Sequence, residues 1–155
     1  MALALLALAV ASAVMGGMFY AFSSFIMTAL GRIPPAEGIR AMQRINVDVF
    51  RPSFMALFFG IPVASVVLAG LAIWRWDPAV SPFAVAAAVV CVVGCFVVTA
   101  AGNVPLNNAL ERADAETEAG HRLWADYLRR WTRWNTVRTV ACLAAAVLLL
   151  WPLLP

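Results

Sequence analysis

Amide side chains inside an apolar segment are the residues of this sequence best suited to chemistry. Between Asp77 and Glu111 the chain has 33 residues without a charged side chain, and the last third of this segment contains Asn103 and Asn107. A buried amide costs free energy unless it is hydrogen-bonded, so an asparagine in an apolar helix faces another helix or a polar cavity. We therefore expect the functional site near the end of this segment.

Further polar residues are expected at the same end of the protein as these asparagines. They come from independent parts of the chain: Ser23, Gln43, Asn46, Asn108, Asn135 and Arg138. If each lies on the helix expected for it below, hydroxyls, amides and one guanidinium converge on one end of a helical bundle. This convergence is the main functional indication in the sequence.

Each of these residues also has a structural interpretation, which the sequence leaves open. A serine in a helix often bonds the carbonyl one turn back, and asparagine or glutamine can join helices or cap their ends. Arg138 can extend to the lipid headgroups. Trp131 and Trp134 fit an aromatic belt at the membrane interface.

The elements that position these residues are membrane helices. Apolar residues make up 64% of the 155-residue chain and charged residues 12%, with a mean hydropathy of +0.88, outside the range of soluble domains. Four segments are long enough to cross a bilayer, which takes about 20 apolar residues. They cover about residues 3–30, 53–75, 80–110 and 136–154. We predict an all-α integral membrane four-helix bundle that forms one domain over residues 1–155.

The first apolar segment is expected to be a span rather than a cleaved signal peptide. No Arg or Lys precedes its apolar run, and the run continues to Leu30. Small residues recur every four positions in this segment, and this pattern predicts a close contact with another helix. They are Ala9, Ala13, Gly17 and Ala21.

The arginines predict the orientation in the membrane. The sequence has no lysine, and its arginines gather in the two long connections, leaving only Arg75 in the short middle loop. Because positive residues favour the cytoplasmic side, we expect both long loops in the cytoplasm and both termini outside, in the plasma membrane. The net charge of +3 indicates contact with the lipid bilayer and not with nucleic acid.

The two long connections are expected to contain amphipathic helices. In residues 35–51 helical periodicity gathers one inward face: Ile39, Met42, Gln43, Asn46, Val49 and Phe50. A second inward seam has steps of four and three and continues into the last span: Trp124, Leu128, Trp131, Asn135, Arg138 and Cys142. For this second segment a helix lying in the membrane interface is the alternative.

Several classes of site lack the residues they need. His121 is the only histidine, and the three cysteines form no CxxC pair, so we expect no metal site. The sequence has no phosphate-binding glycine loop, serine-nucleophile motif or dinucleotide fingerprint. No acidic residue lies within an expected span, which argues against an ion-coupled transporter or channel subunit.

Four sequence blocks resemble the anthrone-oxygenase-like family of small four-span membrane proteins, most of whose bacterial members have no established function. The blocks cover residues 17–30 (GMFYAFSSFIMTAL), 42–46 (MQRIN), 103–110 (NVPLNNAL) and 131–140 (WTRWNTVRTV). Together they make the resemblance fairly specific over nearly the whole chain. The first block has Met27-Thr28 where the family often has Met-Pro, so a kink at this position is not supported.

The resemblance implies an oxidoreductase that converts an anthrone to an anthraquinone with molecular oxygen and with no cofactor. The substrate would be a small, flat, apolar aromatic molecule of anthrone or polyketide type. Such a molecule has an acidic C–H, and its carbanion can pass an electron directly to oxygen. The protein then only has to hold the substrate and stabilise the developing oxyanion.

On this resemblance the candidate site residues take two roles. The catalytic set, as oxyanion donors, is Asn103, Asn107, Asn135 and Arg138. The substrate-binding set is Gln43, Asn46, Trp131, Trp134, Ser23 and Tyr127. The general base is either Tyr127 or a water held by Asn46 and Gln43.

The competing interpretation is a non-enzymatic membrane protein. Such a protein binds a quinone, lipid or polyketide, or assists a partner enzyme, and a homo-oligomer is compatible with either function. A cavity distinguishes the two. The enzyme interpretation predicts an open apolar pocket at the Arg-rich end, ringed by Asn46, Asn103, Asn107, Asn135 and Arg138. The accessory interpretation predicts that the amides bond each other and the backbone, without a ligand-sized void.

Overall fold

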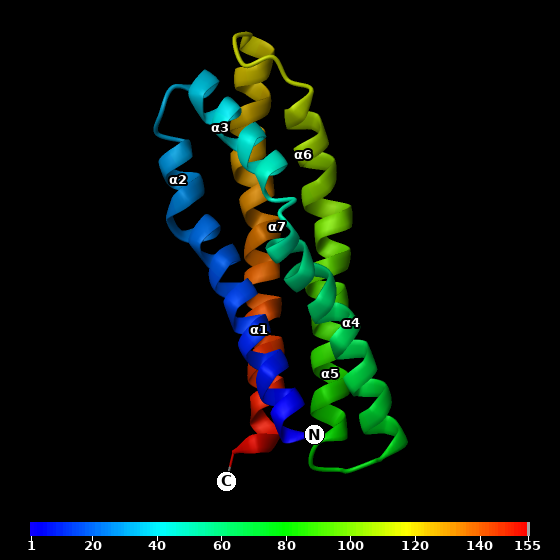
Figure 1. Cartoon of the computed structure of the whole chain (residues 1–155). Helices are drawn as coiled ribbons and strands as arrows, with labels where there is room; N and C mark the ends of the chain where they lie inside the picture. The colour runs from blue at the N-terminus through cyan, green and yellow to red at the C-terminus, as the bar shows by residue number, and fades with distance from the viewer. Residues whose placement is uncertain (155) are drawn as a thin grey trace.

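The protein is a bundle of long helices. The computed structural model describes residues 1–154, and within this range every regular element is helical (Figure 1). Four stretches are long and apolar enough to cross a membrane: Ala2–Leu30, Pro52–Trp74, Ser81–Glu111 and Glu118–Leu153. The prediction of an all-α integral membrane four-helix bundle is confirmed.

Helices α1 and α7 form the central pair. Helix α1 (Ala2–Ala21) continues through a π-helical turn (Phe22–Ile26) into α2 (Met27–Leu30), and α7 (Glu118–Leu150) runs antiparallel beside it, followed by a 3₁₀ turn (Trp151–Leu153). The close approach is at Gly16, where a Cβ atom would lie 3.0 Å from Leu143. The predicted stripe of small residues is wrong in part, because Ala9 is buried in the core but the middle of the stripe is not. Ala13 and Gly17 are exposed, and a Cβ atom at Gly17 would meet nothing within 4 Å.

The other two membrane helices form the second side of the bundle. Helix α4 (Pro52–Trp74) packs against α5 (Ser81–Cys91), which continues through π-helical turns at Val92–Val97 and Thr99–Asn103 into α6 (Val104–Glu111). Pro105 has no backbone N–H to donate, and a widened turn directly before it lets the helix continue. At Gly94 a Cβ atom would lie only 2.6 Å from that of Ala141, so this glycine allows α7 to lie close.

Helix α3 (Pro35–Asp48) crosses the bundle at the end away from both chain termini (Figure 1). Pro35 occupies the first turn, where a missing N–H costs nothing, and Pro52 begins the next helix. Ile39 and Met42 are buried against α7, as the periodicity predicted. The helix ends at Asp48, about one turn earlier than expected, and Phe50 beyond it is 72% exposed.

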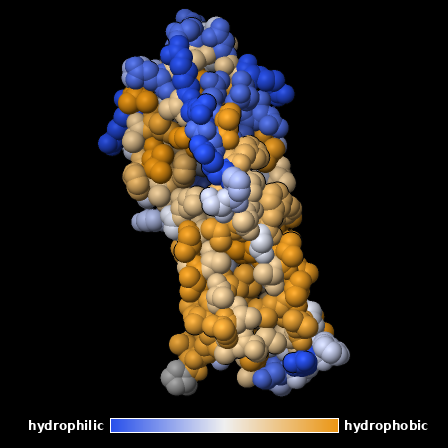
Figure 2. Space-filling view, viewed as in Figure 1, coloured by the Kyte–Doolittle hydropathy of each residue, from blue (hydrophilic) through white to orange (hydrophobic). Residues whose placement is uncertain are grey.

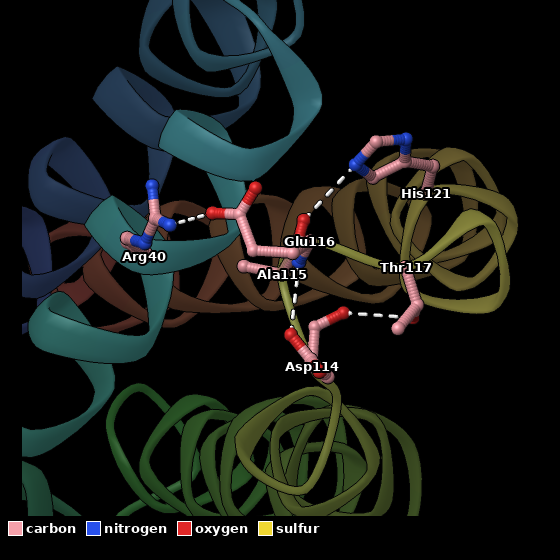
Figure 3. A network of polar contacts seen from close by, with 6 residues as sticks. All are labelled: Arg40, Asp114, Ala115, Glu116, Thr117 and His121. Atoms are coloured by element: carbon pink, nitrogen blue, oxygen red, sulfur yellow. Dashed lines mark hydrogen bonds and ion pairs between the residues drawn. The ribbon is translucent and has the colours of Figure 1, made fainter.

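A polar network fastens α3 to the loop between α6 and α7 (Figure 3). Arg40 of α3 forms an ion pair with Glu116 of this loop. The loop itself is ordered by Thr117, which caps the start of α7, and by His121, whose Nε2 lies 2.9 Å from the Ala115 carbonyl oxygen. The Gln43 amide also donates to the Leu110 and Ala113 carbonyl oxygens, at 2.9 and 3.1 Å. Helix α3 is thereby held as a cover over this end of the bundle.

The surface divides as a membrane protein requires. In Figure 2 hydrophilic residues gather around α3 and the adjoining ends of α6 and α7, and a second, smaller group lies at the α4–α5 turn. The surface between them is predominantly hydrophobic. We refer to the end that carries α3 as the polar end.

Candidate functional site

The Arg138 side chain lies inside the bundle and is only 6% exposed. Its Nη2 donates to Asn135 Oδ1 at 2.7 Å, and its Nη1 donates to Thr99 Oγ1 at 3.3 Å. The guanidinium carbon lies 4.2 Å from the centre of the Phe19 ring and 5.3 Å from that of Trp131. The side chain therefore does not extend to the lipid headgroups, and two neutral groups and two aromatic rings hold it in place.

No carboxylate within residues 1–154 lies at ion-pair distance from this guanidinium. The ion pairs in this part of the chain join exposed side chains at the polar end. A buried cation is costly unless it is paired and hydrogen-bonded. The Arg138 Nε–H is buried and has no partner. A bound molecule that carries negative charge would supply the counter-charge that these residues lack.

Asn135 orients Arg138 and joins α7 to α1. Its amide nitrogen donates to the Phe19 carbonyl oxygen at 2.6 Å and to Ser23 Oγ at 2.7 Å, while its Oδ1 accepts from Arg138. The side chain is fully buried. The π-helical turn of α1 begins three residues after Phe19, and such turns often occur at functional sites. Asn135 and Ser23 therefore act here as positioning residues.

Asn107 and Asn103 join α6 to α7. Asn107 Oδ1 accepts from the Tyr127 hydroxyl at 2.9 Å and from the Trp131 indole N–H at 2.8 Å. The Asn103 amide donates to the Trp131 carbonyl oxygen at 3.2 Å. These bonds fix the Trp131 ring beside Arg138. The Tyr127 hydroxyl is a donor in this arrangement, so its geometry does not favour it as the general base.

A cavity of about 240 Å3 lies between α1, α3, α4, α6 and α7, with Arg138 on its wall. Its polar lining consists of Asn46, Thr99, Asn107 and Arg138. The remaining wall is apolar: Met18, Phe19, Phe22, Met42, Ile45, Val49, Phe50, Phe54, Met55, Phe58, Phe59, Val104 and Trp131. Small-molecule sites usually have volumes of about 300 Å3 or more and a mainly apolar lining. At about 240 Å3 this cavity is somewhat smaller than that, so it suits a small apolar ligand.

Of the residues that the sequence singled out, four line the cavity: Asn46, Asn107, Trp131 and Arg138. The expected ring of amides is therefore incomplete. Asn103 and Asn135 lie behind the wall, where they bond backbone carbonyls, and Ser23 bonds Asn135. Gln43 caps the end of α6, Tyr127 is buried behind Trp131, and Trp134 is 42% exposed and packs against Gly102.

Sequence reasoning missed most of the apolar wall and one hydroxyl. Phe54 and Phe58 follow the predicted Phe50 at steps of four, and this spacing was the available signal for an aromatic face at the start of α4. Thr99 lies at the π-helical turn of the third membrane helix. Its hydroxyl donates to the Cys95 carbonyl oxygen at 2.7 Å and accepts from Arg138.

Two hydrogen-bond donors on the cavity wall are buried without a partner. They are Arg138 Nε and Asn46 Nδ2. An unpaired buried donor costs about 1–3 kcal/mol, and this cost is recovered when a ligand supplies an acceptor. The cavity therefore favours an apolar ligand that carries oxygen acceptors.

A second hollow, of about 350 Å3, lies between α3 and α6. Asn46, Asn107, Phe50 and Val104 line both hollows, so two amides and two apolar side chains separate the cavity from this second space. Glu111 lies on the wall of the second hollow and is exposed. The second hollow therefore gives a polar approach to the amides at the cavity wall.

No three or more His, Cys, Asp or Glu residues in the described part of the chain lie together as a metal site would require. Cys91, Cys95 and Cys142 are buried free thiols within the bundle.

Comparison with known proteins identifies a family for the chain. A family model described as Anthrone oxygenase matches residues 50–148, more than half of the chain. The matched range contains Asn107, Trp131 and Arg138 of the cavity wall. No curated protein and no solved structure matches the chain.

The position of Trp131 is predicted to depend on Asn107. Asn107→Leu leaves the Tyr127 hydroxyl and the Trp131 indole N–H without an acceptor, at a cost of about 1–3 kcal/mol for each buried donor. We expect a lower midpoint of thermal unfolding in detergent, followed by circular dichroism. Asn107→Asp keeps an acceptor and should lose less, and Asn108→Leu, at an exposed position, is the control. Equal midpoints for the two leucine variants would contradict this prediction.

Proposed function

The chain belongs to the anthrone oxygenase family, and from this membership we propose that it is a membrane-embedded oxygenase for a small, flat, apolar substrate of anthrone type. The substrate occupies the cavity beneath α3, with its oxygen atom at Arg138. The observation that carries this proposal is the buried guanidinium on an apolar cavity wall, with no carboxylate partner among the described residues and an unpaired Nε–H.

The proposed chemistry uses that charge. Loss of a proton from the carbon opposite the anthrone carbonyl moves negative charge onto the carbonyl oxygen. Arg138 stabilises this oxyanion more strongly than the neutral ketone, which lowers the barrier to ionisation. The anion passes an electron to O₂, and the two radicals join as a peroxide anion at that carbon. This anion takes a proton back from water to give the hydroperoxide, and loss of water leaves the second carbonyl. The balance is C14H10O + O2 → C14H8O2 + H2O.

We propose that this reaction proceeds without a cofactor, because the substrate anion itself reduces oxygen. The proton leaves to water at the amide partition formed by Asn46 and Asn107, and from there passes into the hollow that carries Glu111. This route replaces Tyr127 and Gln43 as candidates, since both are engaged in hydrogen bonds of the fold.

The substrate is proposed to enter from the bilayer. Phe59 and Met18 lie on the cavity wall and are 50% and 37% exposed, so the cavity reaches the outer surface of α1 and α4. Phe59 lies seven residues after Pro52, the first residue of α4, which is about 10 Å along the helix axis. An apolar aromatic molecule dissolved in the membrane would reach Arg138 by this side without crossing water.

A non-enzymatic binder is the second candidate function. The observation that favours it is the cavity lining, in which no His, Asp or Glu is available as a base. In this case the same cavity holds a phenolate or quinol anion against Arg138 without turnover. Oxygen consumption distinguishes the two functions.

Arg138→Met is predicted to reduce the catalysed oxidation of a hydroxyanthrone by about 100-fold or more, because removal of one oxyanion donor has effects of this order. The measurement is oxygen uptake by the protein in lipid nanodiscs, after subtraction of spontaneous autoxidation. Arg138→Lys keeps a charge but loses the Nε–H and should be intermediate. Arg122→Met, at an exposed position of the same helix, should match wild type. Uptake by Arg138→Met equal to wild type would rule out the proposed role. Absence of uptake by wild type across several anthrones would favour the binder.

We further propose that the polar end faces the cytoplasm and that both termini lie outside. The three native cysteines are buried, so an introduced cysteine reports its own side of the membrane. Ala79→Cys in the α4–α5 turn should react with a membrane-impermeant maleimide on intact cells, and Arg112→Cys beyond α6 should react only after lysis. The reverse pattern would show the opposite orientation.

A further inference from the structure

A depression of about 440 Å3 lies between α2 and α7 at the polar end, and we call it the α2–α7 groove. Its wall carries three arginines and three threonines: Thr28, Arg32, Arg129, Thr132, Arg133 and Thr136. None of these six residues lines the cavity around Arg138. The groove is therefore a separate site, and the proposed oxygenase function does not use it.

The charge of the groove is mostly uncompensated. Arg129 Nη2 lies 3.3 Å from Asp126 Oδ1, but Arg32 and Arg133 have no carboxylate at ion-pair distance within residues 1–154. Both of these side chains are exposed at the groove. Two free guanidinium groups, one in the turn after α2 and one on α7, favour a bound anion, and the geometry of arginine suits phosphate in particular.

A buried hydroxyl adds a further polar group. Thr132 Oγ1 is buried and has no hydrogen-bond partner, whereas Thr136 Oγ1 donates to the Thr132 carbonyl oxygen at 2.9 Å and also lies 3.0 Å from Ser23 Oγ. The Thr132 hydroxyl is thus free to donate to a ligand oxygen. An unpaired buried hydroxyl costs free energy, and a phosphate oxygen that accepts its hydrogen bond would remove this cost.

The groove continues into an apolar surface. Met27, Gly31 and Leu128 complete its wall. From Thr132, steps of four, four, three and four along α7 lead through Thr136 to a stripe of Val140, Leu143 and Val147, which are 62%, 42% and 58% exposed. A ligand that fills the groove and follows this stripe has an anionic head and an apolar tail.

We propose that the α2–α7 groove binds the phosphate of an anionic phospholipid, with Arg32, Arg133 and Thr132 at the phosphate and an acyl chain along the α7 stripe. The groove lies where the Arg-rich end meets the hydrophobic surface, the level at which a bilayer carries its phosphates. A soluble phosphate satisfies the arginines equally but leaves the stripe unused, so the lipid is the favoured source of the anion.

Native mass spectrometry of the intact protein, released from micelles with equal amounts of phosphatidylglycerol and phosphatidylcholine, tests this proposal. Wild type should retain one phosphatidylglycerol in preference to phosphatidylcholine. Arg32→Gln with Arg133→Gln should weaken retention about 25-fold, taking about fivefold for each arginine near a membrane phosphate. Thr132→Val, which keeps shape and charge, should weaken it about threefold.

The matched control removes two arginines elsewhere at the polar end. Arg44→Gln with Arg122→Gln has the same loss of charge, and both residues are exposed and lie outside the groove. Retention that falls equally in control and groove variants would overturn the proposal in favour of unspecific surface charge. Equal retention of the two lipids, displacement by glycerol phosphate at the same concentration, or a lipid-free dimer in place of the lipid adduct would overturn it as well.

Discussion

The burial of one guanidinium inside an apolar bundle is the constraint on which the rest of this structure depends. Arg138 is held by an amide, a hydroxyl and two aromatic rings, none of which neutralises its charge. Phe19 and Thr99 come from the first and third membrane helices. Asn135 and Trp131 lie on α7 itself and are hydrogen-bonded to α1 and α6. The helices must therefore assemble around Arg138 in one arrangement, and the cavity beside it is where the missing negative charge can be supplied.

The polar residues of the bundle divide into two groups. Asn103, Asn135 and Gln43 bond backbone carbonyls and join helices, so they build the site without touching its contents. Asn46 and Arg138 keep a buried donor unpaired on the cavity wall. Both interpretations of the amides that the sequence allowed are therefore realised, each in different residues. Because one group of residues holds the helices together and the other keeps unpaired donors, the site is rigid and still has donors available for a ligand.

The fold was largely readable from the sequence, because hydrophobic length and helical period are local properties. The four apolar stretches and the seam from Trp124 to Cys142 lie where periodicity indicated, although Leu128 in that seam is only half-buried. The site was readable only in part. Asn107 and Asn103 are four residues apart on one helix, yet the first lines the cavity, whereas the second lies one turn away and donates to the Trp131 carbonyl oxygen. The free surface at Gly17 likewise depends on which face of α1 meets α7, which spacing alone does not determine.

The most direct test of the central claim is the ionisation of a hydroxyanthrone bound to the protein, measured without oxygen. Anaerobic absorbance spectra of the substrate in nanodiscs, taken across a pH series, report the ketone and its coloured anion separately. If Arg138 stabilises the oxyanion, the bound substrate should ionise about one to three pH units lower with wild type than with Arg138→Met or empty nanodiscs. The same apparent pKa in all three samples would contradict the account.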